Sequence, residues 1–322
     1  MYDPTSVARA AAEAAEALKS VARDQALKAM VMDSQELYPL LLRAARRYVC
    51  GEEREDALAT ARELSARGYL VSLEFIGENT HSADECRRTT DEFLDLIAAC
   101  HLPDSTISLD LSHVGLSVDS ALAASHLTEL AAAAAKRGHT IMISMEESSK
   151  TDRILDTYRK VTGRFANVGI TIQAHLYRSD EDVRALLNYP GRIRLVKGAY
   201  QEPPDVAIPR GSELDRRYLE FVAHVVEAGH PVSIATHDER IIDELKRRGY
   251  LGMPSVMVEM LYGIRPDLLR RLRADGIKTQ VYLTYGREWY LYLCHRLAEY
   301  PPNIYTAVAD IVDPRRTETV PY

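Results

Sequence analysis

The chain has 322 residues, 46% of them hydrophobic and 27% charged, as expected of a soluble globular protein with a sizeable core. A net charge of −7 argues against binding nucleic acid through a basic surface. No apolar run reaches the roughly 18 residues of a membrane span, no secretion signal is recognisable, and the four cysteines are scattered without a CxxC pair. We therefore expect a cytoplasmic protein with reduced thiols.

Residues 4–66 have the pattern of helices. The stretch SVARAAAEAAEALKSVARDQALKAMVM is rich in strong helix formers. The stretches LYPLLLRAARRYVCG and EDALATARELSARG follow it and end at Gly51 and Gly68, where glycine favours a helix stop. Residues 1–68 are thus predicted to form an N-terminal helical segment packed on the domain that follows.

From residue 69 the pattern changes to short apolar or β-branched runs, each followed by a stretch of helical periodicity. The eight predicted strands are residues 69–77, 106–112, 139–145, 168–176, 192–200, 231–237, 255–261 and 279–285. Strands that alternate with helices predict an α/β fold with a parallel sheet, and eight units predict a (βα)8 TIM-type barrel over residues 69–302. A doubly wound open sheet is the alternative, although no GxGxxG follows the first strand. The polar residues 303–322 are predicted to be a partly packed tail.

The last predicted strand leads through Gly286 into a helix with an unusually polar face. Tyr292, His295, Arg296 and Glu299 lie at i, i+3, i+4 and i+7, so their side chains share one side of that helix. A phenol, an imidazole, a guanidinium and a carboxylate together are too polar for ordinary core. This face is predicted to hold a small charged molecule.

Polar side chains also gather at the predicted strand ends, where barrels of this kind place their chemistry. They are Glu74, Glu78, Asp110, Ser144, Glu146, Gln173, His175, Arg194, Lys197, Thr236, His237, Glu259 and Tyr282. Two cations in one buried-type strand, Arg194 and Lys197, favour an anionic ligand such as a phosphate or a reduced cofactor, although each could instead pair with a neighbouring acid. Gly198 allows a backbone to approach that ligand closely.

A metal site is the competing interpretation of the same strand ends. Asp110, His113, Glu146, His175 and His237 could in principle bind a divalent cation in a barrel hydrolase. However, no His-x-His ends the first strand and no HExxH occurs. We therefore predict no metal.

Three segments together resemble the proline dehydrogenase family: LVKGAY, ATHD and YGxxWYxYxxxRLAE, with MLYGIRP and VGITIQAHLYRS in addition. The resemblance covers residues 69–302 and is strongest to the short monofunctional bacterial enzymes. It implies a distorted barrel with noncovalent FAD across the strand ends. It also implies an oxidoreductase of amino-acid metabolism acting on CH–NH groups, with hydride transfer to flavin N5.

The resemblance also implies roles for individual residues. The FAD contacts would be Gln173, Arg194, Lys197, Gly198, Ala199, Tyr200, Thr236 and His237. Arg194 would lie near flavin N5 and stabilise reduced flavin. The substrate contacts would be Leu261, Tyr282, Tyr292, Arg296 and Glu299, with Arg296 on the substrate carboxylate.

The sequence departs from the family where the substrate is held. Asp110 stands where the family has a carboxylate-binding lysine, Ser144 where it has an aspartate, and His295 where it has the first of two arginines. Met257-x-Glu259 replaces a family Glu-x-Gln. Losing two charge-assisted hydrogen bonds would cost on the order of 3–6 kcal/mol of binding. We accordingly predict Asp110, Ser144, Arg194 and Tyr282 as catalytic residues and Asp110 and His295 as substrate contacts.

These departures predict a substrate other than plain L-proline: a small amine or imino acid of specialised metabolism, oxidised at a C–N or N–N bond, with an extra cationic group beside Asp110. One alternative is a genuine L-proline dehydrogenase that forms 1-pyrroline-5-carboxylate. Another is a flavin-binding protein without dehydrogenase activity. The family resemblance implies a quinone acceptor and a peripheral contact at the inner face of the membrane, while dioxygen is equally open. The oligomeric state stays open.

Overall fold

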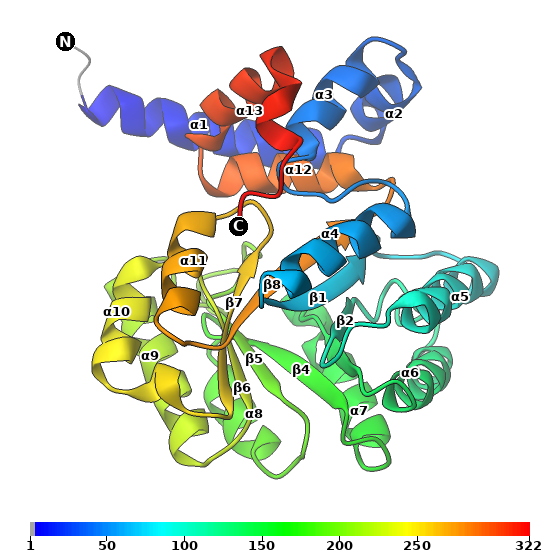
Figure 1. The fold of residues 1–322 in the computed structure, drawn as a ribbon, viewed down its shortest axis with the longest axis vertical. Coiled ribbons are helices and arrows are strands. Elements are labelled where there is room, and N and C mark those ends of the chain that lie inside the picture. Colours follow the sequence, from blue (N-terminus) through cyan, green and yellow to red (C-terminus); the bar gives the residue numbers. More distant parts are fainter. Residues whose placement is uncertain (1–3) are drawn as a thin grey trace. The chain divides into compact units, whose positions relative to one another are not determined.

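The predicted barrel is confirmed. The computed structural model describes residues 4–322, with side chains from residue 9 onward except at position 23. Eight parallel strands close into a barrel in the order β1 to β8, each strand pairing with its sequence neighbour (Figure 1). The strands are β1 Leu70–Phe75, β2 Thr106–Leu109, β3 Thr140–Ile143, β4 Val168–Gln173, β5 Ile193–Val196, β6 Val232–Ala235, β7 Val256–Leu261 and β8 Thr279–Tyr285.

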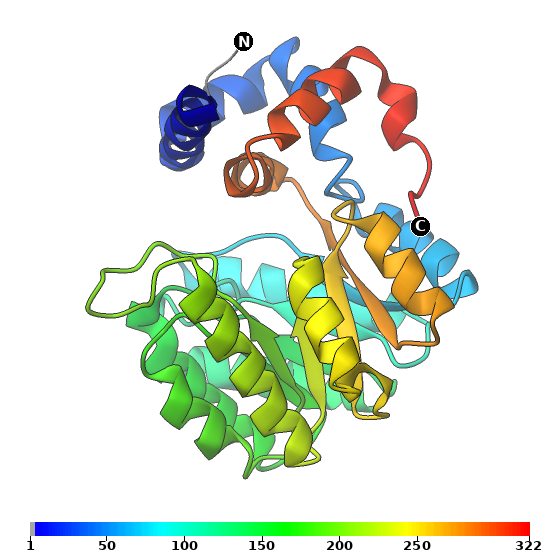
Figure 2. The ribbon, with the colours of Figure 1, turned by 90° about the vertical axis from the view of Figure 1, so that its left-hand side faces the viewer.

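Helices lie outside the strands, and Figure 2 shows α9, α10 and α11 on that outer side. The elements between the strands are α5 Ala83–Ala99, α6 Ser120–Ala135, η1 Ser148–Lys150, α7 Thr151–Thr162, α8 Ser179–Leu186, α9 Ser212–Glu227, α10 Glu239–Arg247, η2 Tyr250–Gly252 and α11 Pro266–Ala274. Several helices begin at a capping side chain, because an oxygen there accepts an otherwise unpaired N–H. Ser82, Asp119 and Asp238 do so for α5, α6 and α10.

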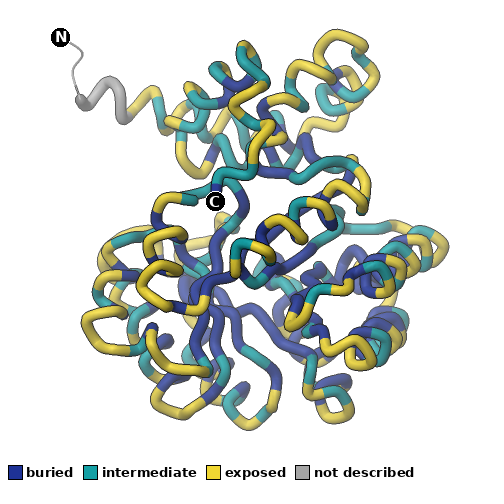
Figure 3. Tube along the Cα trace, viewed as in Figure 1, coloured by how far each residue is buried: buried dark blue, intermediate teal, exposed yellow. Residues whose placement is uncertain are grey.

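The two faces of the strands differ in chemistry. The outward-facing residues are aliphatic and almost fully buried against the helices, and Figure 3 shows the strands as the most buried part of the barrel. They include Val71, Leu73, Ile107, Leu109, Ile141, Ile143, Ile170, Ile172, Ile193, Leu195, Val232, Ile234, Val256, Val258, Val281 and Leu283. Because successive side chains alternate between faces, the intervening residues point into the barrel, and many of these are polar.

The chain divides into two compact units. One contains Ala61–Leu283 with Tyr322, and the other contains the residues up to Thr60 together with Thr284–Pro321. The second unit holds the helices α1 Pro4–Arg23, α2 Gln25–Asp33, α3 Leu37–Ala45, α12 Trp289–Glu299 and α13 Asn303–Val312 and the turn η3 Pro314–Thr317. Helix α4, Arg54–Ala66, crosses from one unit into the other.

These units do not coincide with the predicted segments 1–68, 69–302 and 303–322. Within its unit, α12 packs along α1 and against α3, and α13 packs against α3 (Figures 1 and 2). The predicted tail therefore contains a packed helix. Its Asp310 is fully buried and accepts hydrogen bonds from Arg47 Nη2 at 2.6 Å and Arg316 Nε at 3.0 Å. Two guanidinium groups thus compensate the charge of one buried carboxylate. The polar composition of the tail does not predict this buried cluster.

In the part of the chain that the structure describes, no helix is long and apolar enough to cross a membrane.

Candidate functional site

Arg194 lies at the centre of the barrel interior. Its guanidinium contacts Glu259 on β7, with Nη2 2.9 Å from Oε1 and Nε donating to Oε2 at 3.1 Å. It also donates to the Ser108 hydroxyl at 2.6 Å, and Ser108 is hydrogen-bonded to Ser72 at 2.8 Å. Arg194 and Glu259 are 4% and 3% exposed, so this is a buried ion pair with additional hydrogen bonds. Burial alone would lower the pKa of Arg194, but Glu259, Tyr282 and Glu74 outweigh it and raise that pKa.

Above this ion pair, Glu74 and Tyr282 face each other across neighbouring strands. The Tyr282 phenol donates a hydrogen bond to the Glu74 carboxylate, and the Arg194 guanidinium carbon lies 4.9 Å from the centre of the Tyr282 ring. Burial raises the pKa of Glu74, and this effect outweighs the lowering of that pKa by the Tyr282 hydrogen bond and by the Arg194 charge. Burial and the adjacent Glu74 carboxylate raise the pKa of Tyr282 well above its usual value. Tyr282 is therefore a hydrogen-bond donor at neutral pH.

Asp110 follows β2 at the same end of the barrel. Burial is the main reason why its pKa is raised well above the usual value, and the carboxylates of Glu74, Glu146 and Glu78 add to the effect, whereas Lys150 lowers it. This environment favours the neutral form of the Asp110 carboxyl group more than solvent does. The predicted acid at position 110 thus belongs to an acidic barrel mouth.

Glu146, just after β3, connects several loops around this mouth. It is buried, accepts the Ser112 N–H at 2.9 Å and the Lys150 ammonium at 2.6 Å, and its backbone carbonyl accepts the Gln173 side-chain amide at 2.9 Å. Ser144 directly follows β3, and its N–H donates to the Leu109 carbonyl at 2.9 Å. The structure thereby brings the predicted residues Gln173 and Ser144 to the same rim.

The Lys197–Tyr200 segment forms the rim after β5. The Lys197 ammonium contacts Asp215 on α9 and lies 2.9 Å from Asp238, the residue that caps α10. Gly198 has a φ of +116°, and a Cβ there would lie 1.6 Å from His175 Nδ1, so only glycine fits. Ala199 is exposed.

Tyr200 is half-buried at the end of this segment. Burial, followed by Asp110 and Glu78, raises the pKa of Tyr200 well above its usual value, which ties this rim electrostatically to the acidic mouth.

His175 and His237 both have a defined tautomer. His175 Nδ1 lies 2.9 Å from the Lys197 carbonyl, so Nδ1 carries the proton and Nε2 is an acceptor. That Nε2 atom is buried and has no hydrogen-bond partner among the described residues. His237 Nε2 accepts the Leu261 N–H at 3.0 Å, so its proton lies on Nδ1. The neighbouring Thr236 hydroxyl accepts the Asp238 N–H at 3.2 Å.

The polar face of α12 forms as predicted. Arg296 Nη2 donates to Glu299 at 2.7 Å, and the Arg296 guanidinium lies 5.0 Å from the centre of the Tyr292 ring. His295 adjoins them on the same helix. This helix belongs to the unit of α1 and α3, and a substrate-binding role for its four polar residues stays a prediction.

Sequence reasoning did not assign three of the residues that organise the mouth. The sequence marks Glu259 as a strand-end residue and a departure from the family, but not as the ion-pair partner of Arg194. It marks His175 as a strand-end residue and a possible metal ligand, and it gives Lys150 no role. A local signal for Lys150 existed in the run Glu146-Glu147-Ser-Ser-Lys150, where a cation follows two acids directly after a strand.

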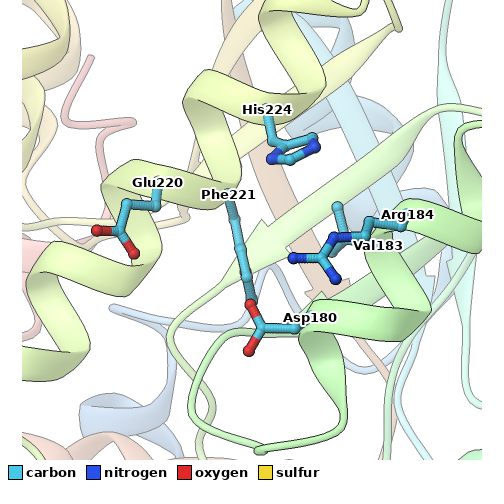
Figure 4. A pocket seen from close by; sticks show the side chains of 6 residues that line it. All are labelled: Asp180, Val183, Arg184, Glu220, Phe221 and His224. Atoms are coloured by element: carbon cyan, nitrogen blue, oxygen red, sulfur yellow. The ribbon is translucent and has the colours of Figure 1, made fainter.

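A separate cavity of about 260 Å³ lies on the outer surface, between α8 and α9 (Figure 4). It is lined by Asp180, Val183, Arg184, Glu220, Phe221 and His224. None of these residues is at a strand end, so this cavity is distinct from the barrel mouth. Among the described residues, no group of three or more His, Cys, Asp or Glu could hold a metal ion.

Comparison with known proteins decides the family. The family model for proline dehydrogenase matches residues 57–303. Proline dehydrogenase from Deinococcus radiodurans is 37% identical over 269 residues, covering 80% of this chain and 87% of that protein. The chain belongs to the proline dehydrogenase family. Proline dehydrogenase 2 from Bacillus subtilis is 33% identical over 266 residues, covering 81% of this chain and 88% of that protein.

Solved structures agree with the fold. Proline utilization A from Bdellovibrio bacteriovorus has a TM-score of 0.74 and 19% identity, covering 87% of this chain but only 36% of that longer protein. A mutant of proline utilization A from Bradyrhizobium japonicum has a TM-score of 0.68 at 20% identity, covering 85% of this chain and 33% of the other. This chain thus spans about a third of those proteins.

As a member of the proline dehydrogenase family, the chain is an FAD-dependent oxidoreductase acting on CH–NH groups. The residues at the strand ends fit this cofactor. Gly198 lets the His175 ring pack directly against the backbone of this rim, and the buried His175 Nε2 lacks a donor that a hydroxyl group could supply. Arg194 provides a buried positive charge of the kind that stabilises an anionic reduced flavin.

Proposed function

We propose that this member of the proline dehydrogenase family is a dehydrogenase or oxidase of a small amine or imino acid other than plain L-proline. It would act on a C–N or N–N bond in specialised metabolism, with a quinone or dioxygen as the electron acceptor. The observation that carries the proposal is Asp110, an acid within an acidic mouth, at the position where the family resemblance implies a lysine that grips a carboxylate.

The proposed cofactor contacts are those named from the resemblance: Gln173, Arg194, Lys197, Gly198, Ala199, Tyr200, Thr236 and His237. When bound, FAD supplies a hydride acceptor for the carbon beside a substrate nitrogen. The ion pair with Glu259 keeps the Arg194 guanidinium in the barrel interior. The hydrogen bond to Glu74 fixes the Tyr282 ring, which we propose packs over the substrate beside Leu261.

Asp110 supports a cationic substrate group in two ways. Its pKa is raised by burial and by the surrounding acids, so the empty site need not hold an uncompensated buried charge. A cationic group that binds beside Asp110 would lower its pKa again, and the two charges would compensate one another. A carboxylate in the same place would meet acids from three loops. We therefore expect a cationic ligand to release a proton from the protein as it binds.

The second candidate is a genuine L-proline dehydrogenase. It is favoured by the names of the relatives from Deinococcus radiodurans and Bacillus subtilis. This candidate needs another cation to hold the proline carboxylate, and by resemblance Arg296 would provide it.

Anaerobic flavin bleaching tests the two candidates together. The purified FAD-loaded protein is mixed with L-proline and with cyclic and open-chain amines that carry a second amine or a hydrazine group. We expect rapid bleaching by a member of the second set and slow bleaching by L-proline. The Asp110→Lys variant should gain about 10- to 150-fold in L-proline affinity, the equivalent of one charge-assisted hydrogen bond. Efficient bleaching of the unaltered protein by L-proline would refute the proposal, and a protein without flavin absorption would refute both candidates.

A further inference from the structure

Lys150 is a cation that the reaction described above does not use. It ends the short η1 turn after β3, and its side chain is 19% exposed. Its ammonium donates to Asn79 Oδ1 at 2.7 Å and to Glu146 Oε2 at 2.6 Å, and lies 2.9 Å from Glu147 Oε2. Three oxygen partners match the three donors of an ammonium group, so the side chain is fixed in one place.

Through these partners Lys150 joins the loops that surround Asp110. Asn79 belongs to the loop after β1, and its N–H donates to the Ser112 hydroxyl at 3.1 Å, in the loop after β2. A second Lys150 partner, Glu146, accepts the N–H of that same Ser112 at 2.9 Å. Asp110 therefore lies between two loops that are tied to one another by Lys150.

The other charges that act most strongly on Asp110 are carboxylates. Glu74 and Glu78 face it from β1 and the loop after it, Glu146 from the loop after β3, and the phenols of Tyr200 and Tyr282 from the loop after β5 and from β8. Arg194 is engaged by Glu259 in the barrel interior. Lys150 is a cation that opposes these acids at Asp110.

We propose that Lys150 is a positioning residue that sets the charge selectivity of the substrate pocket. By tying the loops together and by placing a fixed positive charge near Asp110, it makes that carboxyl group able to ionise when a cationic substrate group arrives. Without Lys150 the pKa of Asp110 would be higher still, and a cationic ligand would compete more strongly with a proton at that carboxyl group. This inference rests on the proposed role of Asp110.

Two ring compounds of similar size and opposite charge test the inference: pyrrolidine, a cation, and cyclopentanecarboxylate, an anion. Their affinities for the FAD-loaded protein are measured from pH 6 to pH 9 by the change in the flavin absorption spectrum. We expect Lys150→Met to weaken pyrrolidine binding roughly tenfold near pH 7 and to shift its pH dependence to higher pH. Lys150→Arg should retain most of the binding.

A matched control is Lys246→Met, because Lys246 pairs with Asp275 on the outer surface, where its side chain is 52% exposed. This variant should leave the binding of both ring compounds unchanged. If Lys150→Met does not fold because Glu146 is left as a buried unpaired charge, Lys150→Met/Glu146→Gln takes its place and is compared with Glu146→Gln alone, because Glu146 itself acts on Asp110. An unchanged pyrrolidine pH profile in the folded variant would overturn the inference.

The Asp110→Asn background separates this inference from the proposed function. If Lys150 acts through Asp110, adding Lys150→Met to Asp110→Asn should not change the pyrrolidine pH profile further. A further change of equal size would mean that Lys150 acts by another route, and the inference would fail. If Asp110→Asn itself leaves the preference between the two ring compounds unchanged, the proposed function fails at that step, before Lys150 is altered.

Discussion

The buried ion pair between Arg194 and Glu259 gives the sharpest prediction about stability. Glu259→Gln removes the negative charge but keeps the shape of the side chain and one acceptor oxygen. Because the Arg194 guanidinium would stay buried at 4% exposure without a counter-charge, we expect the barrel to lose about 3 kcal/mol, the lower end of the cost of breaking a buried pair. The hydrogen bond from Arg194 to Ser108, at 2.6 Å, cannot replace the lost charge.

Hydrogen exchange of the backbone amides in β5 and β7 measures this loss, because these amides report the free energy of opening the barrel separately from that of the other compact unit. Glu244→Gln is the matched control: Glu244 pairs with Arg247 and Arg248 on the surface of α10, where solvent screens the charges, and we expect little change. If the two variants are equally stable, the ion pair does not stabilise the barrel and the reasoning is refuted.

A double variant tests the same reasoning from the opposite side. Replacing both partners, as Arg194→Met/Glu259→Met, leaves no unpaired charge in the barrel interior. We expect it to be more stable than either single methionine variant, because apolar residues of similar volume tolerate burial without a partner. A double variant less stable than both single variants would show that the hydrogen bonds to serine, and not charge compensation, dominate this site.

Three further predictions concern other parts of the chain. Gly198→Ala should lower the ratio of bound flavin to protein, since the new Cβ would collide with His175, whereas Gly252→Ala, with nothing within 4 Å of its Cβ, should not. Asp110→Asn should become more stable relative to the unaltered protein as the pH rises above ~4. Because the folded state raises the pKa of Asp110, this residue contributes its full stability only below the ordinary pKa range of aspartate, and that contribution is lost as the pH rises through the folded-state pKa. A difference in urea unfolding between the two proteins that does not change with pH would contradict this. Asp310→Asn should weaken the packing of α13 by about 2 kcal/mol, seen as faster hydrogen exchange in that helix alone.

The barrel was predictable from sequence because its signal is local. Each strand is a short run rich in β-branched or aliphatic residues followed by a helix, and several of these helices begin at a capping side chain, as at Ser82 and Asp238. Arg194 was also predictable as a functional candidate, since a guanidinium in a buried-type strand needs a partner. The partner itself was not, because Glu259 is 65 residues away along the chain and meets Arg194 only after the barrel closes.

Distance along the chain also limits what the sequence predicts about the helices at its two ends. The face shared by Tyr292, Arg296 and Glu299 follows from helical spacing alone and forms as expected. The grouping of α12 with α1 and α3 depends on contacts between segments more than 200 residues apart, which periodicity cannot encode. Asp310 illustrates the point: its two arginine partners come from both ends of the sequence.

The contrast between the two faces of the barrel strands has a consequence for how such a protein can change. The aliphatic residues that hold strands to helices, such as Leu73 and Leu109, lie on one face, and the polar residues that meet a ligand lie on the other. An exchange such as lysine for aspartate at position 110 therefore leaves the packing between sheet and helices intact. A change of charge in the interior layer can therefore alter what the barrel mouth binds while the packing of the scaffold stays the same.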